Sequence, residues 1–350
     1  MKQNSRKEVK LLYLAGIDVG SVTTKLVVID EQNKVIFQTY LRTAGGPILS
    51  IQNAFRQLRE KAGSDLEISG VGTTGSGRHL ASLMVGADVV KNEITAHATA
   101  ARFVAPEVRT VIDIGGQDSK IIFLNQGVST GFNMNTVCAA GTGSFLDHQA
   151  ARLGIPIEEF GELALKSKSP VRIAGRCGVF AESDLIHKQQ MGYPKEDLIA
   201  GLCLALVSNY LTNVARNRKI EPMVLFQGGV AANIGIRAAF ETKLNIPVIV
   251  PKYYQVMGAL GAALITRKEM LARPRQTGFR GIYAITNFTC RPRSFICADC
   301  ANNCEVNELY IQDELISRWG SKCGKWENLN LPSAKAVNLV QEAPLKTISG

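Results

Sequence analysis

The sequence predicts an α/β protein made of two related halves that face each other across a phosphate-binding cleft. Residues 16–30, GIDVGSVTTKLVVID, and 111–124, VIDIGGQDSKIIFL, align without gaps. Each places an Asp, a Gly two residues later and a Lys seven residues later inside apolar flanks. A third glycine-rich stretch, VLFQGGVAAN at 224–233, ends one apolar run and opens a helical pattern. The duplication therefore predicts two lobes, and the glycines predict an anion between them.

Composition favours a globular protein of ordinary density. The chain has 350 residues, 46% of them apolar, which is enough for two compact lobes. The N-terminal apolar run Leu11–Leu14 is cut short by Asp18, which favours a buried strand over a secretory signal. No apolar stretch approaches the ~20 uninterrupted residues of a membrane helix. We expect a cytoplasmic protein with no membrane partner.

The formal net charge of +10 raises the question of a nucleic-acid partner. Basic residues do gather late in the chain, but no aromatic residues are interleaved with them in the way that nucleic-acid-binding surfaces require. We therefore expect a solvated basic face, or a docking surface for an acidic protein, and no nucleic acid. The basic residues are Arg273, Arg275, Arg280, Arg291 and Arg293.

Each repeat reads as a β-hairpin whose turn points backbone N–H groups at a bound phosphate. One Asp-x-Gly motif alone would indicate an ordinary hairpin, whereas two in matched register favour nucleotide binding. The two aspartates would hold Mg²⁺, through water. The predicted catalytic residues are Asp18, Glu93, Asp113 and Gln117. The predicted nucleotide contacts are Gly20, Ser21, Thr23, Thr24, Lys25, Gly115, Gly116, Asp118, Lys120, Gly228, Gly229 and Asn233, with the hydroxyl of Ser119 as a further donor.

A helix is expected between the hairpins, at residues 91–101, where small residues suit a tightly packed crossing. Glu93 on this helix would position the attacking water, and His97 is interpreted as a satisfied core histidine. The turn at 224–233 suits the nucleoside or α-phosphate side of the cleft. The chain contains no G-x-x-x-x-G-K-[ST] pattern, which argues against a P-loop enzyme.

The order of these motifs, followed by the helical stretch MGALGA at 257–262, resembles the superfamily of sugar kinases, heat-shock chaperones and actin. The resemblance implies a duplicated actin-like ATPase fold, with two ribonuclease-H-like lobes around the nucleotide cleft. We expect one lobe at residues 11–110 plus 250–270, and the other at 111–249.

Within that superfamily, the chain resembles the activators of 2-hydroxyacyl-CoA dehydratases, a group that includes the ATPase subunits of benzoyl-CoA reductase. The resemblance rests on NTVCAAGTGSFLDHQAARLG (135–154), GRCGVFAESDLIHKQQMG (175–192) and DIGGQDSK, and it extends over residues 11–270. It implies an ATPase whose hydrolysis drives single electrons to a 2-hydroxyacyl-CoA dehydratase, a benzoyl-CoA reductase-like enzyme or a double-cubane reductase. An upstream ferredoxin or flavodoxin would supply the electrons.

The resemblance also implies a homodimer in which two cysteines of each subunit hold one [4Fe–4S] cluster, here Cys138 and Cys177. The residues agree with this, because each cysteine precedes a helical pattern, and a helix N-terminus lowers a thiol pKa and stabilises an anionic cluster. The alternative is that both are small buried apolar residues. That alternative is preferred for Cys203, which lies inside the apolar stretch LCLALVSNYL.

Residues 271–350 form a C-terminal extension beyond the resemblance. A basic, turn-rich linker comes first, and then four cysteines in the pattern C-x₆-C-x₂-C-x₃-C predict a site for Zn²⁺ or a second iron–sulfur cluster. Cys323 follows with no assigned role. The four predicted ligands are Cys290, Cys297, Cys300 and Cys304.

Two other functions fit the same fold. A small-molecule kinase would need an aspartate base beside its acceptor hydroxyl, and the sequence offers no convincing candidate. A non-redox, actin-like or chaperone-like module would leave Cys138 and Cys177 without a purpose.

Overall fold

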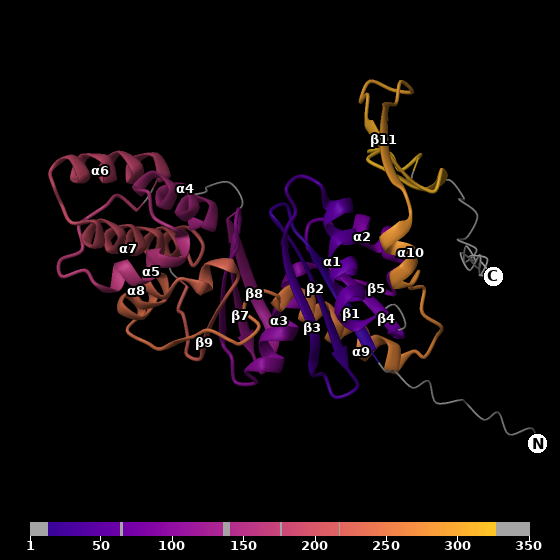
Figure 1. Ribbon diagram of the computed structural model, residues 1–350, viewed down its shortest axis with the longest axis horizontal. Helices are drawn as coiled ribbons and strands as arrows, with labels where there is room; N and C mark the ends of the chain where they lie inside the picture. The colour runs from indigo at the N-terminus through magenta and orange to yellow at the C-terminus, as the bar shows by residue number, and fades with distance from the viewer. Residues whose placement is uncertain (1–12, 64–65, 136–140, 176, 217, 327–350) are drawn as a thin grey trace, which may run out of the picture.

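The computed structural model describes residues 13–63, 66–135, 141–175, 177–216 and 218–326. Two five-stranded sheets form the body of the protein and lie side by side (Figure 1). The first has the order β3-β2-β1-β4-β5 and the second the order β10-β9-β6-β7-β8. The strands of the first are β1 (Tyr13–Val19), β2 (Thr23–Asp30), β3 (Val35–Arg42), β4 (Ile68–Thr74) and β5 (Val89–Val90). Those of the second are β6 (Thr110–Ile114), β7 (Ser119–Asn125), β8 (Val128–Asn135), β9 (Val224–Gln227) and β10 (Val248–Ile249).

The two sheets have the same topology, and the two sequence repeats occupy equivalent strands in them. Strands β1 and β2 pair antiparallel and β1 and β4 pair parallel, as β6 and β7 and then β6 and β9 do. The predicted α/β fold of two duplicated halves is confirmed, and a small C-terminal sheet is present as well.

Helices cover both faces of each sheet. Strand β1 is buried along nearly its whole length rather than on alternate residues, which is the pattern of a strand with helices on both sides. The first half carries α1 (Pro47–Ala62) and α2 (Arg78–Val85), and the second carries α4 (Gly143–Leu153), α5 (Ile157–Leu165), α6 (Gly178–Gln190), α7 (Lys195–Asn213), the 3₁₀ helix η2 (Gly229–Ala232) and α8 (Ile234–Leu244).

Helices α3 (Glu93–Val104) and α9 (Met257–Ala272) lie between the sheets and pack against each other. Small residues make this close approach possible. A Cβ added at Gly261 would stand 1.9 Å from the carbonyl oxygen of Ala96, and one at Gly16 would stand 1.9 Å from that of Ala259. The apolar core here joins residues of both sheets, so the two halves share a packed centre.

The C-terminal extension begins with α10 (Ile282–Asn287), which packs against α1. The segment expected to be a linker is anchored on the first half, because Asp88 accepts hydrogen bonds from Gly278 N and Thr277 Oγ1 at 2.9 and 2.7 Å. Gln52 of α1 also donates to the carbonyls of Ile285 and Phe288. A three-stranded antiparallel sheet follows, made of β11 (Cys290–Ile296), β12 (Glu305–Ile311) and β13 (Glu314–Trp319).

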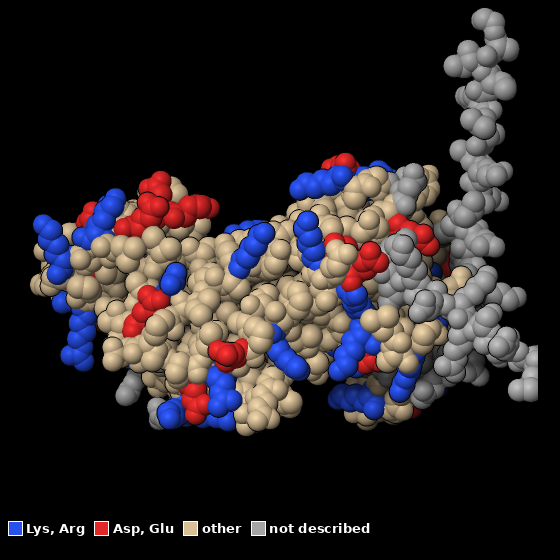
Figure 2. Space-filling view, turned by 90° about the horizontal axis from the view of Figure 1, so that it is seen from below, with Lys and Arg blue, Asp and Glu red and all other residues tan. Residues whose placement is uncertain are grey.

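On the face drawn in Figure 2, Lys and Arg side chains are interspersed with Asp and Glu. The basic residues of the extension also take part in local contacts, as when Arg293 lies over the ring of Tyr310 and Arg318 pairs with Glu308. Within the described ranges, none of the helices has both the length and the apolar character that crossing a membrane demands.

Candidate functional site

The turns of the two hairpins meet across a polar cavity of about 270 Å³. The register pairs Asp18 with Lys25 in the first hairpin and Asp113 with Lys120 in the second, so the repeat places equivalent side chains on both walls. A second, wider cavity of about 370 Å³ adjoins it and shares the two turns. Lys25 and Lys120 line the smaller cavity, whereas Leu146, Ile157 and Ile234 line the wider one, so the two suit the phosphates and the base of a nucleotide, respectively.

In the first hairpin, Asp18 is buried and its Oδ2 accepts from Lys25 Nζ at 3.1 Å. Burial alone would lower the pKa of Lys25, but the Asp18 carboxylate outweighs it and the pKa is raised. Asp18 Oδ1 has no hydrogen-bond partner among the described residues. A buried carboxylate oxygen without a partner is unfavourable, so it suits a ligand such as a water of a hydrated Mg²⁺.

In the second hairpin, Lys120 is 2% exposed and contacts three carboxylates. Its Nζ lies 2.9 Å from Glu93, 3.0 Å from Asp118 and 3.5 Å from Asp113. Burial opposes the charge of Lys120, but the three carboxylates outweigh burial and raise its pKa. The pKa of Asp118 is raised, first by its burial and further by the negative charges of Glu93 and Asp113.

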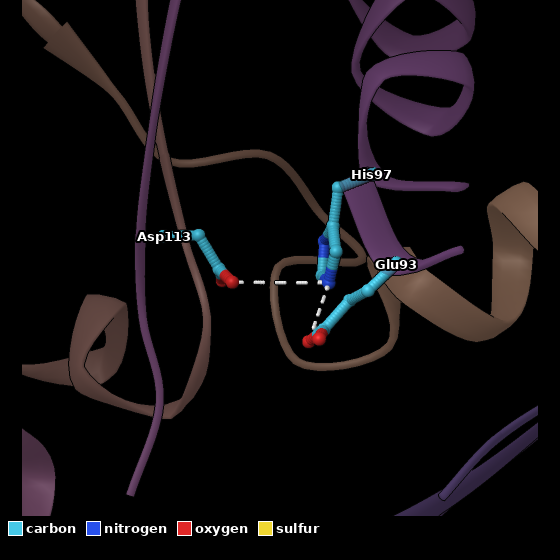
Figure 3. A group of neighbouring side chains, drawn as sticks. All are labelled: Glu93, His97 and Asp113. Carbon is cyan, nitrogen blue, oxygen red and sulfur yellow. Dashed lines mark ion pairs between the residues drawn. The ribbon is translucent and has the colours of Figure 1, made fainter. Parts of the chain in front are cut away.

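His97 lies between Glu93 and Asp113 (Figure 3). Its Nε2 is 3.5 Å from the Glu93 carboxylate and 3.7 Å from that of Asp113, while Nδ1 contacts the Gln227 amide at 2.5 Å. Burial alone would lower the pKa of His97, but Asp113 and Glu93 raise it. In the same way, burial would raise the pKa of Glu93, but His97 and Lys120 hold it well below its usual range.

The ligand atoms of Glu93, His97 and Asp113 lie within 4.8 Å of one another, as in a metal site. However, the Lys120 ammonium already contacts two of these groups, so the cluster holds a cation in the form of a lysine. The sequence interpretation of His97 as a core histidine was incomplete, because it is buried and bonded but also lines the cavity. The sequence did carry a signal for this position of His97, because it follows Glu93 by four residues, a spacing that places both side chains on the same face of a helix.

Two of the predicted hydroxyl donors do not line either cavity. Thr24 Oγ1 is buried and bonds to Thr43 Oγ1 at 3.0 Å, and Ser119 is buried with its Oγ unpartnered among the described residues. The reason is strand alternation: Thr23 and Lys25 face the cleft, so Thr24 between them faces the other way. In this geometry neither Thr24 nor Ser119 lines the cavity between the turns.

The remaining turn residues lie where the nucleotide was expected. Ser21 Oγ donates to Gln117 Oε1 at 2.9 Å and thus bridges the two turns. The lining of the polar cavity includes Gly20, Ser21, Thr23, Gly115, Gly116, Gln117, Asp118, Gly228 and Gly229. Sequence reasoning missed Tyr40, Arg42, Tyr254 and Gln255, which also line the two cavities.

The third glycine turn needs glycine at its first position. Gly228 has φ +87°, and a Cβ there would stand 2.4 Å from the Ile114 carbonyl oxygen. Asn233 caps α8 by accepting from Ile236 N at 3.1 Å, and it lines the wider cavity. Its Nδ2 has no partner among the described residues, which leaves a donor facing the place where a nucleoside would lie.

Of the two predicted cluster ligands, Cys138 lies outside the described residues. Cys177 is half-buried at the N-cap of α6, as expected, next to Val179 and Phe180, which are 70% and 65% exposed. Cys203 is buried in α7, where burial raises its pKa to about 12, so it is a core residue. Cys177 thus combines a helix N-terminus with an unpartnered apolar surface.

Hydrogen bonds join the second phosphate turn to α4, the helix that follows the Cys138 segment. Gly143 N donates to Gly115 O at 2.9 Å, and both Ser144 N and Ser144 Oγ donate to Gly116 O at 2.8 and 2.5 Å. At its other end, α4 pairs with α6, because Arg152 contacts Glu182 at 2.7 Å. A movement of the turn would therefore reach both helices beside the predicted cluster ligands.

The extension does not bring its four predicted ligands together. Cys290 is the first residue of β11 and packs against the core of the first half, whereas Cys297 follows the last residue of the strand. Cys297 comes seven positions after Cys290 along this extended segment, a separation of about 23 Å at about 3.3 Å per residue. Cys290 therefore cannot share one ion with Cys297, Cys300 and Cys304, and its inclusion in that site is corrected.

The chain is similar to several known proteins. The chain is 38% identical to the (R)-2-hydroxyglutaryl-CoA dehydratase activating ATPase of Acidaminococcus fermentans over 74% of its own length and 98% of that protein's. It is 28% identical to one of the subunits of the benzoyl-CoA reductase of Thauera aromatica, over 74% and 95% of the two chains.

Among solved structures, the activator of the 2-hydroxyisocaproyl-CoA dehydratase from Clostridium difficile with bound ADPNP matches with a TM-score of 0.68. It is 35% identical and covers 74% of this chain and 95% of its own. The sequence profile of the BadF/BadG/BcrA/BcrD ATPase family matches residues 15–266. The chain belongs to the BadF/BadG/BcrA/BcrD ATPase family.

Proposed function

We propose that this protein is an ATP-dependent activator that donates single electrons to a 2-hydroxyacyl-CoA dehydratase or a related reductase. Its relatives include activators of such dehydratases and a component of a benzoyl-CoA reductase. The observation that carries the proposal is the direct bonding of the second phosphate turn to α4 through Ser144. Through this contact, a shift of the turn on nucleotide binding would act on α4.

ATP would lie with its phosphates between the two turns and its base in the wider cavity. Backbone N–H groups of the turns and the hydroxyls of Ser21 and Thr23 would hold the phosphates. The unpartnered oxygen of Asp18 suits a water of Mg²⁺, and Asn233 Nδ2 would donate to the nucleoside. Bound Mg²⁺ would neutralise phosphate charge.

Hydrolysis needs a water directed at the terminal phosphate and a positive charge beside it. Glu93 stays ionised because Lys120 and His97 hold its pKa low, so it can accept a hydrogen bond from that water. Lys120 keeps its positive charge although it is buried, and it would stabilise negative charge on the phosphate oxygens. Gln117, bonded to Ser21, would leave this bond when a phosphate enters between the turns.

Electron transfer would use a [4Fe–4S] cluster held by Cys138 and Cys177 of two copies of the chain. The cluster would supply a single low-potential electron, drawn from a ferredoxin or flavodoxin. Two cysteines are too few for a cubane, so a two-fold axis beside them would complete the ligand set. The exposed Val179 and Phe180 next to Cys177 suit burial in that dimer interface.

Nucleotide state would act on the cluster through the helices. A shift of the Gly115–Gly116 turn would pull on the N-terminus of α4, and the pair of Arg152 and Glu182 would pass it to α6. Small shifts of packed helices are a common form of such switching. The energy of hydrolysis would thereby make the electron transfer directional.

Purification without oxygen tests the proposal. We expect the wild-type chain to be a brown dimer that carries one [4Fe–4S] cluster, with the visible absorption of such a cluster. The Cys138→Ala and Cys177→Ala variants should lose that cluster and the dimer, and with them activation of the dehydratase. Cys203→Ala, at a cysteine buried in the interior of α7, should keep all three. A colourless, monomeric wild-type protein, or a full cluster in Cys138→Ala, would overturn the proposal.

ATP turnover without any added acceptor gives a second test. An activator should hydrolyse ATP in the absence of a small-molecule hydroxyl, and added sugars or alcohols should yield no phosphorylated product. A kinase would show the reverse pattern, with turnover that depends on the acceptor.

A further inference from the structure

The free end of the C-terminal sheet gathers cysteines that neither the nucleotide site nor the proposed dimer cluster uses. Beyond the last pair of the β11–β12 ladder, Cys297 N donates to Cys304 O at 2.8 Å, so these two residues stand opposite each other. Cys300 lies in the turn between them, and Asn303 N closes that turn by donating to Cys300 O at 3.2 Å. Three cysteines therefore occupy one short loop.

The fourth cysteine approaches from the other side of β12. Lys322 N donates to Cys304 Sγ at 3.5 Å, which brings the segment after β13 onto the cysteine loop. Cys323 is the next residue. Lys325, two residues after Cys323, pairs with Asp299, two residues after Cys297. These contacts place Cys323 beside the loop, whereas Cys290 lies at the opposite end of β11.

We propose that Cys297, Cys300, Cys304 and Cys323 form a four-thiolate site for one zinc or iron ion. The spacing C-x₂-C-x₃-C with a fourth cysteine just after a neighbouring strand is typical of tetrahedral sulfur sites. The N–H donor on Cys304 Sγ and the ammonium of Lys325 would offset the negative charge of the thiolates.

The small sheet also needs such a link for its stability. Its near end is fixed, because Ile311, Ile316 and Cys290 pack against the core of the first half. The far end has no such support among the described residues, and β11 is exposed over most of its length. Units of fewer than about 40 residues usually need a metal, disulfides or a partner to stay folded. A metal at the cysteine end would fix the end that the core does not reach.

Binding requires one local rearrangement. Cys297 Sγ donates to Asp299 Oδ2 at 3.4 Å, and the thiols in the described part of the extension are not grouped within 4.8 Å of one another. Rotation of the Cys297 side chain about its Cα–Cβ bond would release Asp299, which Lys325 already pairs with. Cys290 is not one of the metal ligands. Burial raises its pKa to about 11, which favours the neutral thiol.

Metal analysis of the full-length chain tests the proposal, and does so independently of the proposed function. The Cys177→Ala variant is used as the background, so that iron of a dimer cluster does not contribute. We expect about one zinc or iron ion per chain, which Cys323→Ala loses and the matched control Cys290→Ala retains. Loss of the ion in Cys290→Ala but not in Cys323→Ala would overturn the proposal.

A cobalt titration of the unmutated chain tests the same site without any variant, so its result does not depend on whether a variant folds. The unmutated chain, stripped of metal under reducing conditions, should take up about one Co²⁺ and show the intense thiolate-to-metal absorption of a sulfur site. It should then protect four thiols from a thiol reagent. Absence of that absorption, or recovery of disulfides among these cysteines in protein made under reducing conditions, would refute the metal site.

Discussion

The two phosphate hairpins share one motif but differ in what surrounds their lysines. Lys25 of the first hairpin is 15% exposed and pairs with Asp18 alone, at 3.1 Å, among the described residues. Lys120 of the second hairpin is 2% exposed and pairs with Glu93, Asp113 and Asp118. Duplication has thus supplied two equivalent lysines, and the surroundings have made one a simple ion pair and the other the centre of a buried network.

Their turns differ as well, in the partners of the turn carbonyls. Gly20 O of the first turn accepts from Thr43 Oγ1 at 3.0 Å, a residue that directly follows β3 of the same sheet. In the second turn, the carbonyls of Gly115 and Gly116 accept from the N-terminus of α4. The first hairpin is therefore fixed within its own half, and the second is joined to the helix beside the predicted cluster. One hairpin is thus suited to anchoring and the other to signalling.

The largest expected effect comes from removing the network lysine. Lys120→Met should destabilise the fold by about 3–5 kcal/mol, because it removes the positive charge that the buried Asp113 and the partly buried Glu93 and Asp118 share. It should also reduce ATP turnover by about 100-fold or more. Urea unfolding monitored by circular dichroism and an ATPase assay measure the two effects.

Lys25→Met is the matched control for Lys120→Met. It breaks one pair at a more exposed position, so its cost in unfolding free energy should be clearly smaller. Equal losses in the two variants would contradict the assignment of different roles to the two hairpins.

The second prediction concerns His97, which lies within ion-pair distance of Asp113 of the second hairpin, at 3.7 Å. His97→Gln should destabilise the fold by about 1–3 kcal/mol near pH 6, because it weakens the contacts of buried polar groups. The groups that face His97 are Glu93, Asp113, Gln227 and, more distantly, Lys120.

The pH dependence of this loss has a definite sign. Since the fold raises the pKa of His97, its charged form stabilises the protein fully below the unfolded value of about 6.5. That stabilisation is lost as the pH rises through the folded pKa. The difference in unfolding free energy between the wild type and His97→Gln should therefore shrink from pH 6 towards pH 9. A difference that grows with pH would show that His97 is neutral in the fold.

Much of this architecture could be predicted from the sequence, since the duplicated Asp-x-Gly motif with its apolar flanks reports hairpins directly. Strand alternation would also have excluded Thr24, because Thr23 and Lys25 on either side were assigned to the cleft. The contact of Ser144 with Gly116 was out of reach, because it depends on how α4 packs and no local pattern encodes it. Cys290 failed for a related reason: the spacing C-x₆-C does not reveal that the six residues between the two cysteines form an extended strand, which holds them apart.

The third prediction tests the signalling role of the second turn. Ser144→Ala removes the hydroxyl that donates to Gly116 O but keeps the backbone bond, so ATP turnover should change little. Activation of the partner per ATP hydrolysed should fall about tenfold, equivalent to about 1.4 kcal/mol of coupling. Parallel assays of ATP turnover and of dehydratase activity give the ratio.

Thr43→Val is the control for Ser144→Ala, because it removes the corresponding hydroxyl from Gly20 O of the first turn. It should weaken nucleotide binding without changing the ratio of activation to hydrolysis. If both variants changed the ratio alike, the distinction between an anchoring turn and a signalling turn would fail.

The smallest expected effect concerns two asparagines that each cap the N-terminus of a helix. Asn92 caps α3 by accepting from Thr95 N at 2.8 Å, and Asn233 caps α8 by accepting from Ile236 N at 3.1 Å. Each Asn→Ala variant should cost about 1 kcal/mol of unfolding free energy, because each loses one cap.

Of these two residues, Asn233 adds an unpartnered Nδ2 beside the wider cavity, so Asn233→Ala alone should also weaken ATP binding, by about fivefold to tenfold. Calorimetric titration with a non-hydrolysable ATP analogue measures this, and equal affinity in the two variants would mean that the nucleoside does not contact Asn233.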